Sequence, residues 1–317
     1  MEAGLLARES GTRRLSVRYG IVVLPTQRWS SAVDSWRFAD EAGFEHAWTL
    51  DHLMWRDHRA GPWFSALPVL SAAAVSTRRV HLGTLVASPN FRHPVTLAKE
   101  MMTLDDVSGG RAICGIGSGA YGYDAEVLGM APLSPRVRAE RLVEFTDLLD
   151  RLLRHAVTTY RGSHYEAVEA HLRPGCVQRP RLPLAVAASG PSGLRATASY
   201  ADIWVTNGPS RKFRPQRFEE SVRALPNRLE ALSEACRTVQ RDPSTIRRLV
   251  LAGQQFGGAL DSPAALAELS GSLAEIGVTD LVVFWPGADD AASSRRLATL
   301  EGLAATLSAE LRDGASA

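Results

Sequence analysis

Short runs of apolar and β-branched residues recur along the chain, and amphipathic stretches of helical length separate them. This alternation is typical of parallel strands joined by helices that cover them. The runs predict eight strands, at residues 18–24, 46–50, 80–86, 111–116, 183–188, 202–206, 248–254 and 280–285.

The stretches between these runs carry signals for helix ends. Residues 30–43 and 93–110 both close on glycine, and residues 262–277 open on Ser262 followed by Pro263. These are common residues at helix boundaries. Eight strands with intervening helices predict an α/β fold of the (β/α)8 TIM-barrel type.

A doubly wound open sheet is the alternative fold, and the glycine pattern argues against it. Gly115, Gly117 and Gly119 form G-x-G-x-G, without the G-x-G-x-x-G spacing of a dinucleotide-binding turn. No Lys-Ser or Lys-Thr pair follows them, as a P-loop would require. We interpret these glycines as a strand end where the backbone turns and lets a ligand approach.

The expected organisation is a disordered tail at residues 1–15 and a single barrel domain at residues 16–317. An insertion at residues 122–181 follows the fourth strand, with a strong helix at 134–155 and then an irregular, proline-marked segment. A connection this long commonly forms a lid or substrate wall. An oligomer contact or a simple cover for the barrel is the alternative.

Composition excludes several classes of partner. The formal charge is +2, and only Lys99 and Lys212 among the 36 cationic residues are lysines, so neither a nucleic-acid face nor a polybasic membrane patch is expected. No run approaches the roughly 18 apolar residues of a membrane span. The three cysteines are too far apart for a Cys-x-x-Cys pair, which favours reduced thiols in the cytoplasm.

The active site of a TIM barrel lies at the carboxyl ends of its strands, and here those ends are poor in acids. Asp51 is the one acidic residue among them, so the carboxylate pair of a glycosidase is missing. His52 and His58 are six residues apart, unlike the spacing of a zinc protease, and no G-x-S-x-G elbow occurs. No metal site is expected.

His52 is the candidate acid or base, because its ordinary pKa suits proton transfer near neutral pH. A hydrogen-bonded structural histidine is the alternative. Ser189, Gly190 and Ser192 lie between a strand and a helix start, where free backbone N–H groups favour an anion. There the alternative is an ordinary helix start with Ser192 as its N-cap.

Five motifs occur in order between Val17 and Trp285. They are "TLDH", "HLGTLV" followed by "FRHPVTLAKEMMTLDDVSGGR", "GIGSG", "VQRPRLPLAVAASG" and "ASYADIW". Together they resemble the bacterial luciferase-like flavin- or deazaflavin-dependent oxidoreductases. The resemblance implies a (β/α)8 barrel that binds FMN or coenzyme F420, with the tricyclic ring at the carboxyl mouth.

Carried over motif by motif, the resemblance implies a site around that ring. Asp51 and His52 approach the polar edge or reactive face, Tyr123 covers the tail, and a cis peptide bond joins Leu85 to Val86 behind the ring. The implied cofactor-binding residues are Asp51, Leu85, Val86, Ala87, Ser88, Gly117, Ser118, Gly119, Tyr123, Ala188, Ser189, Gly190 and Ser192. Ala120 stands where the family's sugar-phosphate dehydrogenases carry a glutamate, which argues against that substrate class.

The favoured function is a coenzyme F420-dependent reductase or dehydrogenase that moves a hydride between the deazaflavin and an unsaturated or carbonyl-bearing substrate, with His52 handling the proton. The "TLDH" and "GTLV" segments resemble that branch most, and an arginine-rich, lysine-poor chain suits high-GC actinobacteria. An FMN-dependent monooxygenase and a noncatalytic flavin-binding protein are the alternatives. The substrate is expected to be a small or peptide-derived molecule, for example one of natural-product biosynthesis, and the protein a homodimer.

Overall fold

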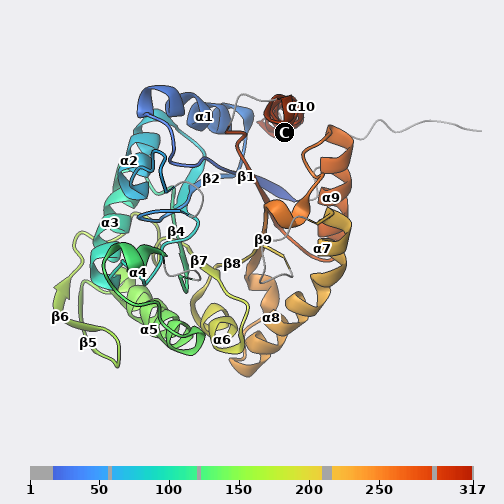
Figure 1. Ribbon diagram of the computed structural model, residues 1–317. Helices are drawn as coiled ribbons and strands as arrows, with labels where there is room; N and C mark the ends of the chain where they lie inside the picture. The colour runs from blue at the N-terminus through green and yellow to red at the C-terminus, as the bar shows by residue number, and fades with distance from the viewer. Residues whose placement is uncertain (1–16, 56–58, 120–122, 209–215, 288–290, 316–317) are drawn as a thin grey trace, which may run out of the picture.

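A computed structural model describes residues 17–55, 59–119, 123–208, 216–287 and 291–315, so the predicted tail at 1–15 lies outside the described residues. Eight parallel strands close a barrel, and each of the eight predicted runs overlaps one of them (Figure 1). The TIM barrel is confirmed and the open sheet is wrong. The strands are β1 (Arg18–Val22), β2 (His46–Thr49), β3 (His81–Thr84), β4 (Ala112–Gly117), β7 (Leu184–Ala187), β8 (Ile203–Thr206), β9 (Arg247–Ala252) and β10 (Asp280–Phe284).

Helices surround the barrel as a ring (Figure 1). Gly43 ends the first of them in the left-handed conformation at φ 90°, and Ser262 accepts a hydrogen bond from the Ala265 N–H at the start of another, as the sequence predicts. The longer helices are α1 (Trp29–Ala42), α2 (Ala66–Ser76), α3 (Pro94–Val107), α5 (Pro135–Arg154), α6 (Pro191–Tyr200), α7 (Phe218–Ala224), α8 (Pro226–Thr238), α9 (Pro263–Glu275) and α10 (Ala291–Ala315). Within the described part of the chain, no helix has the length and apolar content to cross a membrane.

Side chains fill the barrel interior, with the Trp48 ring among the largest of them. A Cβ on Gly83 of the neighbouring strand would lie 2.5 Å from Cζ3 of that ring, so the glycine makes room for the tryptophan. The interior cluster comprises Val22, Trp48, Leu50, Leu85, Ile113, Ala185, Ile203, Val205, Leu249 and Val282. The partly buried residues packed against it are Leu24, Trp55, Trp63, Val86, Ala187, Leu251 and Phe284.

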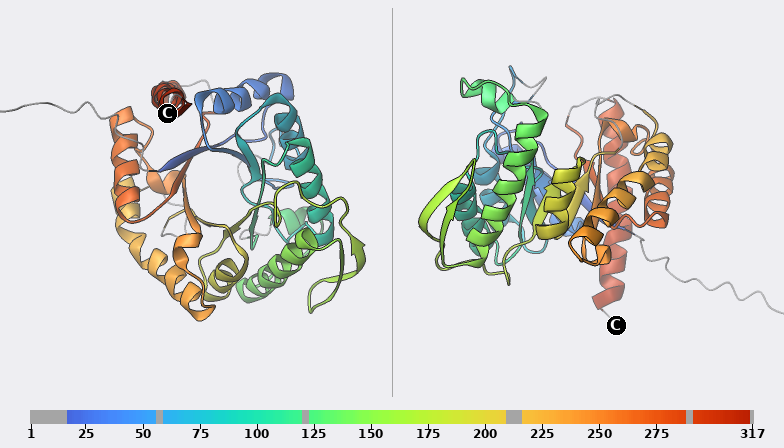
Figure 2. Two further views of the ribbon diagram at one scale, coloured as in Figure 1. Left: turned by 180° about the vertical axis from the view of Figure 1, so that it is seen from behind. Right: turned by 90° about the horizontal axis from the view of Figure 1, so that it is seen from below.

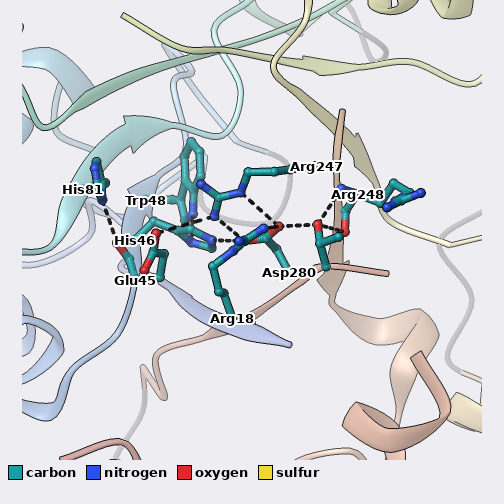
Figure 3. A network of polar contacts seen from close by, with 9 residues as sticks. Arg18, Glu45, His46, Trp48, His81, Arg247, Arg248 and Asp280 are labelled. Carbon is teal, nitrogen blue, oxygen red and sulfur yellow. Dashed lines mark hydrogen bonds and ion pairs between the residues drawn. The ribbon is translucent and has the colours of Figure 1, made fainter. Parts of the chain in front are cut away.

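The amino ends of the strands hold a polar group around the buried side chains of His46 and Asp280. We call it the Asp280 cluster, and it also includes Arg18 and Arg247 (Figure 3). The Arg18 guanidinium donates to both oxygens of Asp280, at 2.9 and 3.1 Å, and Arg247 bonds the same carboxylate. Burial opposes ionisation of Asp280, but the bonds from His46, Arg18 and Arg247 outweigh it and hold the Asp280 pKa well below its ordinary value.

His46 in this cluster is a neutral ring with a defined tautomer. The Trp48 indole N–H can only donate, and it lies 2.7 Å from His46 Nδ1, so Nδ1 is the acceptor and Nε2 carries the proton. Nε2 then donates to Asp280 Oδ1 at 3.1 Å. Burial lowers the pKa of His46, and the bond to Asp280 offsets this only in part.

The segment between β4 and β7 contains α4 (Tyr123–Val127), the predicted helix α5, and a hairpin of β5 (Val157–Arg161) and β6 (Glu166–His171). α5 packs between α3 and α6, as a barrel helix does. The hairpin stands away from the barrel wall (Figure 2). The sequence analysis predicted an irregular segment here and missed the hairpin, because its strands lack an apolar run.

Candidate active site

The carboxyl end of the barrel, which we call the mouth, has its floor where β3 and β4 end. The Leu85–Val86 peptide bond is cis, as the family resemblance implies. Leu85 and Ala87 are buried, whereas Val86 is partly exposed. A Cβ on Gly117 would lie 2.6 Å from Val86 Cγ2, so the Val86 side chain already occupies the space above that glycine.

The loop after β4 is tied to the loop after β3. Gly119 has φ 68°, and a Cβ there would lie 2.3 Å from Ser88 Oγ. The Asn90 amide donates to the Gly119 carbonyl at 3.0 Å, and the Ser88 hydroxyl accepts from the Asn90 N–H at 3.1 Å. Ser88 is buried and its hydroxyl bonds within this loop, while Ser118 is partly exposed beside it.

Asp51 follows β2 and is held by a cation that the sequence analysis did not single out. Arg92 donates to its two carboxylate oxygens at 2.9 and 2.8 Å, and the side chain of Asp51 is only 2% exposed. Burial raises the pKa of the Asp51 carboxyl, against the two bonds from Arg92. Asp51 therefore shapes the mouth through this pair, with its carboxylate oxygens turned to the guanidinium.

His52 is the next residue and is more accessible, with its side chain 18% exposed. Its Nδ1 lies 2.8 Å from Oδ2 of Asp124, a buried residue of α4, and the Leu53 N–H donates to Oδ1 of the same carboxylate at 2.7 Å. The Trp63 indole N–H donates to the His52 carbonyl at 2.8 Å. The Trp55 ring lies beside the imidazole, with 4.5 Å between the ring centroids.

The opposite side of the mouth is the start of α6. Its N-cap is Gly190, with no side-chain cap, so the alternative in which Ser192 caps an ordinary helix start is wrong. The Leu194 N–H is the first to bond within the helix, to the Gly190 carbonyl, which leaves the N–H groups of Ser192 and Gly193 outside the helical pattern. Ser189 is exposed, and no heavy atom lies within 4 Å of a Cβ on Gly190.

The remaining predicted residues also lie at this end of the barrel. Ala188 follows β7 and is partly buried, and its carbonyl accepts from the Trp204 indole N–H. Tyr123 begins α4, where the Arg59 guanidinium lies 4.7 Å from its ring centroid. Ala120 and His58 lie outside the described residues. Among the described residues, no three His, Cys, Asp or Glu side chains are arranged to hold a metal ion.

Comparison with known proteins identifies the family of this chain. Residues 10–253 match the family described as luciferase-like monooxygenase. The chain belongs to this family. It is 36% identical over 206 residues to an F420-dependent glucose-6-phosphate dehydrogenase of Beutenbergia cavernae, and 28% identical over 233 residues to a 5,10-methylenetetrahydromethanopterin reductase of Methanopyrus kandleri.

These alignments cover 63% and 70% of this chain and 58% and 62% of the two relatives, so part of each relative's length is unmatched. A solved structure has the same fold: an F420-dependent secondary alcohol dehydrogenase in complex with an F420-acetone adduct. It matches with a TM-score of 0.69 at 18% identity, over 84% of this chain and 93% of that one.

Three residues that contact the predicted site were missed by sequence reasoning: Asn90, Arg92 and Asp124. Each is bonded to a residue far along the chain, with 72 positions between His52 and Asp124 and 41 between Asp51 and Arg92. The spacing of residues along the sequence does not indicate contacts between positions so far apart. The one usable signal was that a buried acid after β2 needs a cation, and the "FRH" segment provides one.

Proposed function

We propose that this protein is a coenzyme F420-dependent oxidoreductase that transfers a hydride between the deazaflavin and an unsaturated or carbonyl-bearing substrate. The observation that carries the proposal is His52, a partly exposed imidazole just after β2. The chain is related to proteins named as an F420-dependent glucose-6-phosphate dehydrogenase and a 5,10-methylenetetrahydromethanopterin reductase. In such a site His52 exchanges the proton that accompanies the hydride.

The residues at the mouth fit the cofactor in two ways. The partly buried Val86, Ala187 and Phe284, with Trp55 and Trp63, provide an apolar surface at the carboxyl end of the barrel for a flat ring. The open space at Gly190 and the free first-turn N–H groups of α6 suit an anionic tail. When bound, the deazaflavin supplies a carbon that accepts or donates a hydride.

The protein's own part in the reaction is to bind, orient and move a proton. Val86 supports the ring, with Gly117 beneath the Val86 side chain. Ser189 and Ser192 offer hydroxyls to the tail, and Ser118 and Gly119 border it. Asp51 fixes the loop that carries His52 through its pair with Arg92. In this proposal Tyr123, the first residue of α4, covers the tail.

The substrate in this proposal is a small or peptide-derived molecule with an apolar portion. Leu53 and Phe64 are each 40% exposed and flank Trp63 and His52 in the sequence, and Ala120 replaces the glutamate of the sugar-phosphate dehydrogenases. Unsaturated natural products and dehydroamino acids are the first substrates to screen. We also propose a homodimer in the cytoplasm, where three unpaired cysteines are suited to the reducing conditions.

A parallel fluorescence titration with F420 and with FMN tests the cofactor. We expect quenching that saturates with F420 and a much weaker response with FMN. Tight binding of FMN alone would overturn the proposal in favour of an oxygen-dependent monooxygenase, and binding of neither would favour a noncatalytic protein. Replacement His52→Ala should then lower turnover by about 10² to 10⁴-fold with F420 affinity nearly unchanged.

A further inference from the structure

The pair between His52 and Asp124 joins two parts of the chain that are remote in sequence. His52 follows β2, and Asp124 lies in α4, in the segment that separates β4 from α5. Among the described residues, each oxygen of the carboxylate has one partner: Oδ2 faces His52 Nδ1 at 2.8 Å, and Oδ1 accepts from the Leu53 N–H at 2.7 Å. The Asp124 side chain is 3% exposed, so water does not compete for these positions.

This geometry defines where the imidazole carries its proton. An ionised carboxylate can only accept hydrogen bonds, so His52 Nδ1 must be the donor. In the neutral ring Nε2 then has a lone pair. No described residue bonds to Nε2, while Trp55 lies along the ring and Trp63 holds the backbone of His52.

We propose that Asp124 is a positioning residue, which keeps His52 in the tautomer with the proton on Nδ1 so that Nε2 exchanges a proton with the substrate. This rests on the proposed function. When an alcohol is oxidised, its O–H proton passes to the Nε2 lone pair, and its C–H hydrogen leaves with both electrons for the oxidised cofactor. The imidazolium formed lies beside the Asp124 carboxylate, and in the reduction direction Nε2–H returns the proton to the carbonyl oxygen.

The Leu53 N–H makes the effect of Asp124→Asn predictable. A backbone N–H can only donate, so the asparagine carbonyl must face Leu53 and its NH2 group must face His52 Nδ1. Nδ1 then becomes the acceptor, and the neutral ring carries its proton on Nε2. The substitution keeps the volume of the side chain and reverses the tautomer, which leaves the wrong atom protonated for the oxidation reaction.

The experiment combines ¹⁵N NMR of the imidazole in ligand-free protein with steady-state kinetics and F420 titration. We expect wild type to carry its proton on Nδ1 at a pH where His52 is neutral, and Asp124→Asn to carry it on Nε2. We expect the kcat of Asp124→Asn to fall by about 10² to 10⁴-fold, with KM and F420 affinity changed little. Glu126→Gln, the same change at an exposed position of α4, is the matched control and should leave tautomer and kcat unchanged.

Two results would overturn the inference. One is a wild-type spectrum with Nε2 protonated and Nδ1 free, which needs no variant and so does not depend on how a variant folds. The other is an Asp124→Asn protein that binds F420 as wild type does and keeps its tautomer and kcat. Failure of wild type to bind F420 is a different outcome, because it defeats the proposed function and leaves the NMR result as a test of the His52–Asp124 pair.

Discussion

Gly20→Ala is expected to be among the most destabilising single-methyl additions in the barrel. Gly20 of β1 pairs with His46 of β2, and a Cβ there would lie 1.9 Å from His46 Nδ1 and 2.2 Å from its Cε1. The ring has no room to move, because it is fully buried and bonded on both sides, to Trp48 and to Asp280. Accommodating the methyl therefore means breaking the Asp280 cluster.

The size of the effect follows from what is lost. Leaving a buried donor or acceptor without its partner costs about 1–3 kcal/mol, and overpacking adds about 1–3 kcal/mol. With one bond of His46 broken, the free energy of unfolding should fall by about 2–6 kcal/mol, and loss of the second bond would add about 1–3 kcal/mol. That is a large part of the roughly 5–15 kcal/mol typical of a folded protein.

Urea unfolding followed by circular dichroism measures this loss. Gly271→Ala is the matched control, because Gly271 lies inside α9 with no heavy atom within 4 Å of its added Cβ, and it should stabilise the helix by about 0.5–1 kcal/mol. In a His46→Ala background the same Gly20→Ala change should cost much less, since the clash is gone. An equal cost in both backgrounds would refute the reasoning.

Two further perturbations test the buried ionisable groups His46 and Asp51. Burial lowers the folded-state pKa of His46, so the unfolded chain takes up a proton on this ring first as the pH falls below about 6.5, and the free energy of unfolding falls in that range. The urea midpoints at pH 7.5 and pH 5 should therefore differ less in His46→Gln than in wild type. An unchanged difference would contradict this. Arg92→Leu leaves the Asp51 carboxylate buried without a cation and should lower the free energy of unfolding at pH 7 by about 3–5 kcal/mol. Thermal unfolding measures that loss, which should be smaller when Asp51→Asn is added, and an unchanged melting temperature in Arg92→Leu would count against the pair.

The sequence predicted the barrel well because its interior strands are apolar on both faces and are bounded by helix-end signals. The run at 280–285 is an example: Leu281, Val282 and Val283 are fully buried, and the strand ends one residue before the run does. The hairpin at 157–171 was missed because its strands alternate irregularly and expose Val157 and Val168. Such a pattern has no clear period.

The candidate site was predicted only as far as single residues allow. His52 could be identified from its place after a strand, and the cis bond before Val86 from the family resemblance. At the start of α6 only the alternative of a Ser192 N-cap was wrong, because Gly190 stands at the N-cap position before Pro191. Asp124 and Arg92 could not be predicted, because only the closed barrel brings them to the loop after β2.

The two ends of strand β2 lie next to two different groups of residues. His46, at its start, belongs to the closed polar cluster, and Asp51 and His52, just past its other end, belong to the mouth. The four residues from Ala47 to Leu50 separate His46 from Asp51, so we expect loops grafted onto the mouth to leave the Asp280 cluster intact. The barrel is thus a scaffold on which new substrate preferences can be selected by exchanging mouth segments while the stabilising end is kept unchanged.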